Sequence, residues 1–294
     1  MHLLLPMLAS ILFVCGLLLL KRATVAGANP WTVSLVANWW AAFVFSGFWF
    51  LSDAAIPWSL IWQPALVGVF YITGQIGTFL AITHGDVSIA TPLFGVKVFL
   101  VALLATLIGG QSLPVEIWIA AVLATVGIGL VQWTGKAGHS RIAYTIVSAI
   151  GASCSFSVFD VLVQRFCSSE SATWSGNRFL PVMFWFVAVY SLIFLAGFQR
   201  EMFRKASIRR SLLIGGLLIA LQAVCIVFTL SHFGDAPRVN VVYATRGIWG
   251  VLLAWAVAKV WGGNEAHVSR GVMWLRLAGA SLITTGVVVA ILAG

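Results

Sequence analysis

The sequence predicts an all-α, polytopic membrane protein of ten transmembrane helices, arranged as two inverted five-helix repeats. Three observations predict this fold class: the composition, a regular succession of long apolar runs, and a similarity between the two halves of the chain. Of the 294 residues, 61% are hydrophobic and 9% are charged, and the mean hydropathy is +1.03. A soluble chain of this length needs a far more charged surface. Lipid must therefore replace water around much of the protein.

Ten apolar runs are long enough to cross a bilayer, because a helix needs about 20 residues to span the hydrocarbon. Helices are expected and not strands, since lipid would leave the edges of an open sheet without hydrogen bonds. Tryptophans fall near the ends of several runs, as is typical of an interfacial belt. The expected spans are roughly 3–20, 33–51, 61–83, 88–109, 115–133, 142–165, 180–198, 211–232, 239–261 and 272–292.

Basic residues concentrate in the loops that follow odd-numbered spans, such as Lys21, Arg22 and the run QREMFRKASIRR at 199–210. The positive-inside rule then predicts that these loops are cytoplasmic and that both termini lie outside. The basic run is expected to contact anionic lipid headgroups of the bilayer. Nucleic-acid binding is not expected, because no soluble domain would present these residues. The first apolar run is not followed by a small-residue cleavage site, which favours a retained helix over a signal peptide.

An internal repeat connects the two halves of the sequence. At a constant shift of 149 residues, Gly85-Asp86 falls on Gly234-Asp235, and Lys97 falls on Arg246. Such pairs of polar and charged residues are harder to explain by a biased composition than matches of apolar residues are. In each Gly-Asp pair, we expect the glycine to form a tight turn and the aspartate to cap the next helix.

The repeat predicts two halves, 1–138 and 139–294. Each half contains five expected spans, and because five is an odd number the halves cross the membrane in opposite orientations. Inverted repeats of this kind are typical of secondary transporters, with the substrate site near the bilayer midplane between the repeats.

The segment that follows the third span also resembles a known family. Its sequence is AITHGDVSIATPLFGVKVFLVALLATLIGGQSLPVEIWIAAVLATVGIGLV, and the second half closes in a similar way with RLAGASLITTGVVVAIL. These stretches resemble the EamA-type module of the drug/metabolite transporter superfamily. The resemblance implies a ten-helix secondary transporter with a central cavity. It also implies cytoplasmic termini, contrary to the loop charges, so the orientation stays open.

Lys97 and Arg246 are the principal candidate substrate-binding residues, because both are expected near the middle of a span. A charge at that depth costs roughly 2.5–3.5 kcal/mol on insertion scales and therefore needs a cavity or a partner. One interpretation is a two-fold-related pair of cations that binds an anionic substrate and faces the central cavity. The alternative is a structural ion pair with Asp160. Gln75 and Tyr243 are further candidates for the cavity lining.

Asp160 itself has two interpretations. It could be a protonatable coupling group, or it could pair near the end of its span, beside Gln164 and Arg165, and the second is slightly favoured. The sequence contains no phosphate-binding Gly-Lys-Ser/Thr loop and no metal-ligand motif, so we expect no cofactor, no metal and no enzymatic activity.

The function predicted from sequence is a permease that moves a small organic metabolite by alternating access. A flippase for lipid-linked substrates is the alternative within transport, and a polytopic enzyme acting on lipid is the alternative outside it. The expected partners are a small-molecule substrate and the lipid bilayer. The expected state is a monomer or homodimer in a bacterial inner membrane.

Overall fold

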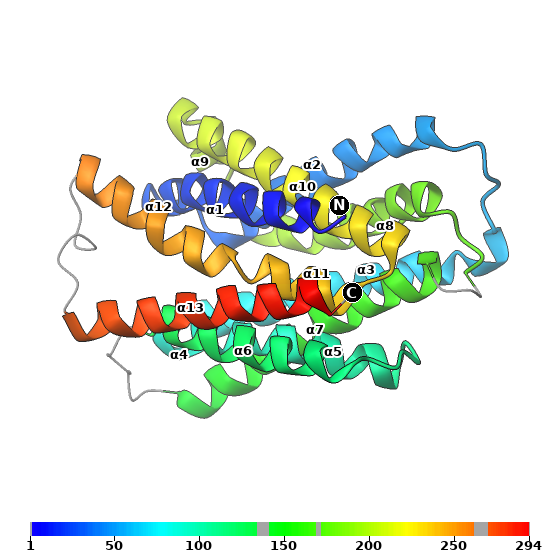
Figure 1. Cartoon of the computed structure of the whole chain (residues 1–294). Helices are drawn as coiled ribbons and strands as arrows, with labels where there is room; N and C mark the ends of the chain where they lie inside the picture. The colour runs from blue at the N-terminus through cyan, green and yellow to red at the C-terminus, as the bar shows by residue number, and fades with distance from the viewer. Residues whose placement is uncertain (1, 134–140, 169–171, 262–269, 294) are drawn as a thin grey trace. The chain divides into compact units, whose positions relative to one another are not determined.

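The computed structural model describes residues 2–133, 141–168, 172–261 and 270–293, and every regular element in these ranges is helical (Figure 1). The predicted all-α, polytopic class is thereby confirmed. The first half contains α1 (Leu4–Val25), α2 (Pro30–Ser46), η1 (Gly47–Leu51), η2 (Trp58–Leu60), α3 (Trp62–Thr83), α4 (Val87–Leu93), η3 (Phe94–Val96), α5 (Lys97–Leu107) and α6 (Val115–Val131). The second half contains α7 (Ile142–Ser168), α8 (Gly176–Tyr190), η4 (Ser191–Gly197), α9 (Arg200–Arg204), α10 (Ala206–Phe233), α11 (Ala236–Tyr243), α12 (Arg246–Trp261) and α13 (Arg270–Leu292).

Within the described residues, eight helical segments are long and apolar enough to cross a membrane, and α6 is a shorter apolar helix. The expected count of ten spans is therefore not confirmed. Two expected spans are not among the eight: the fifth, which forms the shorter α6, and the ninth, 239–261, where the chain forms two shorter helices, α11 and α12. The expected boundary between the halves, at 138 and 139, lies outside the described residues.

The chain forms two compact units, and each unit takes one segment from either half of the sequence. Unit 1 comprises Met1–Ile72 and Leu162–Gly234, and unit 2 comprises Thr73–Val161 and Asp235–Gly294. Two long helices, α3 and α7, contribute residues to both units.

In unit 1, α1 packs along α10, and the two helices are antiparallel (Figure 1). Glycines allow this close approach, since a Cβ added at Gly16 would lie 3.1 Å from the carbonyl oxygen of Gly215. Small residues at helix contacts are the usual means of association in lipid, where apolar surface alone gives little driving force. Near the end of α1, Leu20 and Ala23 form a buried cluster with Leu212 of α10.

Also in unit 1, α2 packs against α8. Phe45 and Phe184 stack with their ring centroids 4.0 Å apart, and both side chains are fully buried. Asn29 fixes the start of α2: its side chain accepts a hydrogen bond from the N–H of Thr32 (2.9 Å) and donates one to the carbonyl of Gly197 (2.7 Å). A capping side chain of this type satisfies a backbone donor that the helix itself leaves without a partner.

In unit 2, α6 and α13 form the most intimate helix pair, and they lie side by side in Figure 1. A Cβ added at Gly127 would lie 2.7 Å from the carbonyl oxygen of Gly279 and 2.7 Å from the side chain of Ile283. Gly129, two residues further along α6, has no atom within 4 Å of the same position. The contact therefore depends on the face of α6 that carries Gly127.

The helices α3 and α7 are antiparallel neighbours in both units. In unit 1, Trp62 at the start of α3 contacts Phe166 near the end of α7. In unit 2, the hydroxyls of Thr73 and Ser155 lie 2.6 Å apart, and a Cβ added at Gly77 would contact Ala152 at 3.1 Å.

Candidate functional site

Two helices of unit 2 are interrupted at equivalent positions of the sequence repeat. Between α4 and α5, the three residues of η3 tighten the helix into a 3₁₀ turn. Between α11 and α12, the N–H of Thr245 donates to Val242 and the N–H of Gly247 donates to Ala244, which is the same tighter hydrogen-bond pattern. At the shift of 149 residues, the starts of α4 and α5 coincide with those of α11 and α12. A 3₁₀ stretch within a helix often marks a functional hinge.

The turns before these helices agree only in part with the prediction. Asp86 caps α4 as expected, because its Oδ1 accepts a hydrogen bond from the N–H of Ser88 at 2.9 Å. Gly234 takes the left-handed conformation, with φ of 65°. Asp235 does not cap α11, however; its carboxylate instead pairs with Arg238, one turn into the helix, at 3.3 Å. The carboxylate of Asp235 therefore contacts the guanidinium of Arg238 in place of a backbone N–H at the start of α11.

Lys97, the first residue of α5, forms an ion pair inside unit 2. Its Nζ lies 2.8 Å from Oδ2 of Asp160 on α7, and the two side chains are 15% and 2% exposed. The same carboxylate oxygen accepts a hydrogen bond from Nδ2 of Asn240 on α11 at 2.8 Å. Two donors therefore compensate the desolvation of Asp160, as a buried carboxylate requires.

Arg246, the first residue of α12, lies beside this ion pair. Its guanidinium stands over the ring of Tyr243, 4.4 Å from the centroid, and Tyr243 is buried. This is a cation–π contact in a setting with little water, where such contacts are strongest. Arg246 is also close enough to Lys97 for the two cations to repel each other. Two cations and one carboxylate leave this cluster with one positive charge.

Two hydroxyl groups of α7 face the interruption between α4 and α5. The hydroxyl of Ser157 donates to the carbonyl of Ser153 at 2.7 Å and lies 3.3 Å from the carbonyl of Lys97, and the hydroxyl of Ser153 lies 3.5 Å from the carbonyl of Leu93. Ser153, Ser157 and Asp160 follow the spacing i, i+4, i+7, so they share one face of α7. This polar face serves both the backbone at the 3₁₀ turn and the ammonium group that follows it.

The structure thus brings four predicted residues together in unit 2: Lys97, Asp160, Tyr243 and Arg246. Gln75 is half-buried on α3 in the same unit. The favoured interpretation of Asp160, pairing beside Arg165 at the end of the span, is wrong. Residues five apart on a helix point in different directions, and Asp160 is buried whereas Arg165 is exposed.

Sequence reasoning missed Asn240 and the two serines of α7. For the serines, the available signal was their helical spacing from Asp160. For Asn240, the signal was an amide side chain in an apolar run, one turn before the interruption. Neither signal identifies the partner, because Asp160 and Asn240 are separated by 80 residues in the sequence.

The fold and this cluster define a class: a polytopic α-helical membrane protein with a charged network within its membrane-spanning helices. Residues 1–133 match the sequence model of the EamA-like transporter family. The resemblance noted for residues 81–131 is thereby confirmed for this part of the chain.

Comparison with solved structures shows that this chain shares its fold with a protein of known structure. One crystal structure matches with a TM-score of 0.74, over 100% of this chain and 99% of that chain, at 16% sequence identity. At this identity the likeness establishes the fold alone. No curated protein matches the chain.

Proposed function

We propose that this protein is a secondary transporter that moves a small organic solute across a membrane by alternating access, and that the solute carries an anionic group. The observation that carries the proposal is the placement of Lys97 and Arg246. Each is the first residue after a 3₁₀ interruption in a helix of unit 2, and the two are related by the repeat shift. Interrupted helices near charged groups are typical of substrate sites in transporters.

The proposed inverted duplication of 1–138 and 139–294 is supported by the way in which the helices pair. Counting expected spans, the structure pairs the first with the eighth (α1 and α10) and the third with the sixth (α3 and α7). Exchanging the five-helix halves converts one of these pairs into the other. The second–seventh, fourth–ninth and fifth–tenth pairs (α2 and α8, α5 and α11, α6 and α13) convert into themselves. A pseudo-two-fold relation between the halves requires this pattern.

The proposed anionic character of the substrate is supported by two basic residues that lie beside one carboxylate. Asp160 pairs with Lys97, and Arg246 stands over the ring of Tyr243. A substrate carboxylate or phosphate would bind the guanidinium of Arg246 through two parallel hydrogen bonds and would add a second anion beside Lys97. Tyr243 and Gln75 are the proposed neighbours of the bound solute, and Asp160 is the proposed charge partner that is displaced or protonated during transport.

A ligand panel tests this proposal on the purified protein. Carboxylates, phosphates, neutral metabolites and cations are compared for thermal stabilisation, because a ligand present at 100 times its Kd stabilises the native state by about 2.7 kcal/mol. Wild type is compared with Lys97→Gln and Arg246→Gln. Arg210→Gln, which removes an exposed cation on α10, is the control.

We expect anions alone to stabilise wild type and the control, and we expect both cluster variants to lose this effect. Stabilisation by cations or neutral solutes that is unchanged in the two variants would refute the anion site. Counterflow in proteoliposomes then tests transport itself. A solute that crosses the membrane without chemical change is expected for a permease, whereas conversion to a product would identify a membrane enzyme. The proposed location is a bacterial inner membrane.

A further inference from the structure

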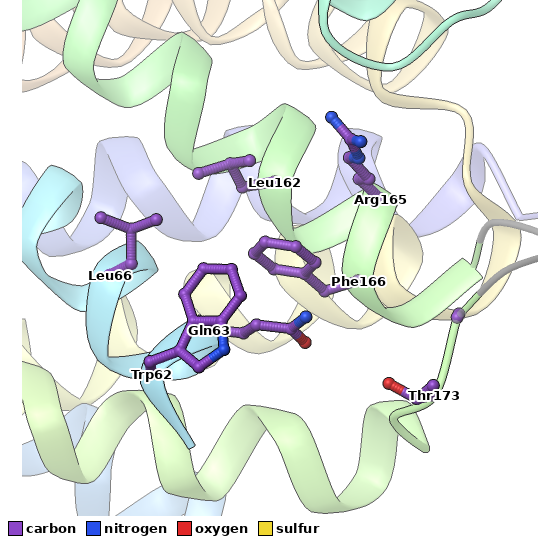
Figure 2. A pocket seen from close by; sticks show the side chains of 8 residues that line it. Trp62, Gln63, Leu66, Leu162, Arg165, Phe166 and Thr173 are labelled. Carbon is purple, nitrogen blue, oxygen red and sulfur yellow. The ribbon is translucent and has the colours of Figure 1, made fainter. Parts of the chain in front are cut away.

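Unit 1 contains a cavity that the transport proposal does not use. It has a volume of about 450 Å³ and is lined by Trp62, Gln63, Leu66, Leu162, Arg165, Phe166, Ala172 and Thr173. The residues of the Lys97 cluster all belong to unit 2, so the two groups share no side chain. Figure 2 shows that α3 and α7 supply most of the lining.

One wall of this cavity is apolar and held in place. Trp62 and Phe166 project toward each other with ring centroids 6.0 Å apart at 78°, an edge-to-face arrangement (Figure 2). Phe166 is supported from behind by Phe179, whose side chain is fully buried. Leu66 and Leu162 continue the apolar surface along the two helices. Such a wall suits an acyl chain or another apolar body.

Two polar residues of different character also line the cavity, Gln63 on α3 and Arg165 on α7. The side-chain oxygen of Gln63 is enclosed and has no hydrogen-bond donor among the described residues. Leaving an acceptor in this condition is unfavourable, so the site favours a ligand that brings an N–H or O–H group. Arg165 also lines the cavity; its side chain is exposed, its guanidinium extends away from Gln63 in Figure 2, and it supplies positive charge suited to an oxyanion.

The position of the cavity at the ends of two candidate spans predicts that it lies where a bilayer changes from hydrocarbon to headgroups. It is formed at the first turn of α3, which begins at Trp62, and at the last turn of α7, which ends at Ser168. Both helices are candidate membrane spans, and tryptophan at the end of a span is typical of the interface. A ligand at this depth meets phosphate groups on one side and acyl chains on the other.

We infer that this cavity binds an amphiphilic phosphodiester that carries a hydrogen-bond donor, such as the ethanolamine headgroup of a phospholipid. Arg165 binds the phosphate, the side-chain oxygen of Gln63 accepts from the ammonium, and the aromatic wall holds the apolar part. The donor requirement makes the inference specific. A choline headgroup has the same phosphate and the same charge but no N–H, so it cannot satisfy Gln63.

The test compares two short-chain lipids that differ only in the headgroup nitrogen, which is a primary ammonium in one and a trimethylammonium without N–H in the other. Purified protein in detergent is titrated with dihexanoyl phosphatidylethanolamine and with dihexanoyl phosphatidylcholine, and binding is followed by native mass spectrometry. We expect the ethanolamine lipid to bind wild type at least fivefold more tightly, since a hydrogen bond to a charged donor contributes on this scale. Equal binding of the two lipids would overturn the inference.

Variants then locate the binding. Gln63→Leu is expected to abolish the preference for ethanolamine, and Gln63→Glu, which keeps an acceptor, is expected to retain it. Arg165→Gln is expected to weaken both lipids about tenfold. Arg210→Gln is the control for the loss of an exposed arginine and should bind as wild type does. Unchanged binding in Arg165→Gln, with a wild-type melting temperature, would place the lipid elsewhere and overturn the assignment.

A soluble headgroup distinguishes the two sources of this chemistry. Glycerophosphoethanolamine carries the same phosphate and ammonium without acyl chains. Saturable binding of this compound supports the cavity as a site for soluble phosphodiesters. Binding that requires the acyl chains supports a site for a bilayer lipid. The transport experiment fails or succeeds separately, because it depends on Lys97 and Arg246 and not on this cavity.

Discussion

The ion pair between Lys97 and Asp160 makes a quantitative prediction about stability. Asp160 is 2% exposed and is compensated by Lys97 at 2.8 Å and by the amide of Asn240 at 2.8 Å. Replacing Lys97 by methionine, which has a similar length and no charge, leaves a buried carboxylate with one neutral donor. Removing one member of a buried ion pair typically costs about 3–5 kcal/mol. We therefore expect Lys97→Met to lower the free energy of unfolding by about 3 kcal/mol or more.

The complementary variant, Asp160→Leu, should cost less. Lys97 is 15% exposed, so its ammonium retains some access to a polar environment, and Nδ2 of Asn240 keeps a second acceptor in the carbonyl of Ala236 at 3.0 Å. The decisive variant is the double one, Lys97→Met with Asp160→Leu. Replacing both members of a buried pair by apolar residues is often neutral or stabilising, so the double variant should be more stable than Lys97→Met alone.

The assay is reversible unfolding in mixed micelles, with increasing fractions of a denaturing detergent, on wild type and the three variants. The double-mutant cycle gives the coupling energy between the two side chains. A coupling energy below about 1 kcal/mol would refute the reasoning, because the two charges would then be solvated independently. Ligand binding separates stability from function: if Lys97 contacts the substrate, the double variant recovers stability without recovering anion binding.

Three further predictions concern a contact between two helices, the cap of a helix and a connecting segment. Gly127→Val should destabilise the protein by about 1–3 kcal/mol, because its Cβ would overlap the backbone of α13. Gly129→Val is the control and should be tolerated. Equal melting temperatures of the two variants would refute the close packing of α6 and α13. Asn29→Ala should lower the free energy of unfolding by about 1 kcal/mol, because the α2 cap is lost. Asn29→Asp keeps the cap acceptor and should lose less. A larger loss for Asn29→Asp than for Asn29→Ala in chemical denaturation would contradict this. Arg178→Lys should make the segment before α3 more sensitive to protease, because the guanidinium donates to the carbonyls of Ala54 and Trp49. An unchanged rate of cleavage would show that these hydrogen bonds are dispensable.

The membrane-spanning organisation could be predicted from the sequence because hydrophobic length is a one-dimensional property. The interruption between α4 and α5 could not be predicted in this way, because η3 is as apolar as its neighbours and the averaged hydropathy does not change there. Two residues carry a local signal. Pro92 removes a backbone donor inside α4, and a Cβ added at Gly95 would lie 2.7 Å from Ile128 of α6.

The candidate site was predictable in its charges and not in its contacts. Lys97, Arg246 and Asp160 stand out in any apolar sequence, since each must be compensated. Which group compensates which depends on helix rotation. Rotation placed Asp160 toward Lys97 and away from Arg165, and hydropathy carries no information about rotation in a span that is apolar on all sides. The sequence repeat relates Lys97 to Arg246, but it gives no indication that Asn240 is a hydrogen-bond partner of Asp160.

The composition of the two units has a consequence for biogenesis. Every segment of unit 1 has been synthesised once the chain reaches Gly234, whereas unit 2 lacks α11, α12 and α13 at that stage. The face of α6 that carries Gly127 then has no partner, because α13 supplies it. Translation order therefore allows unit 1 to assemble before the last helices of unit 2 have been synthesised. A chain arrested after Gly234 would contain every segment of unit 1 and a glycine face on α6 that lacks its α13 partner.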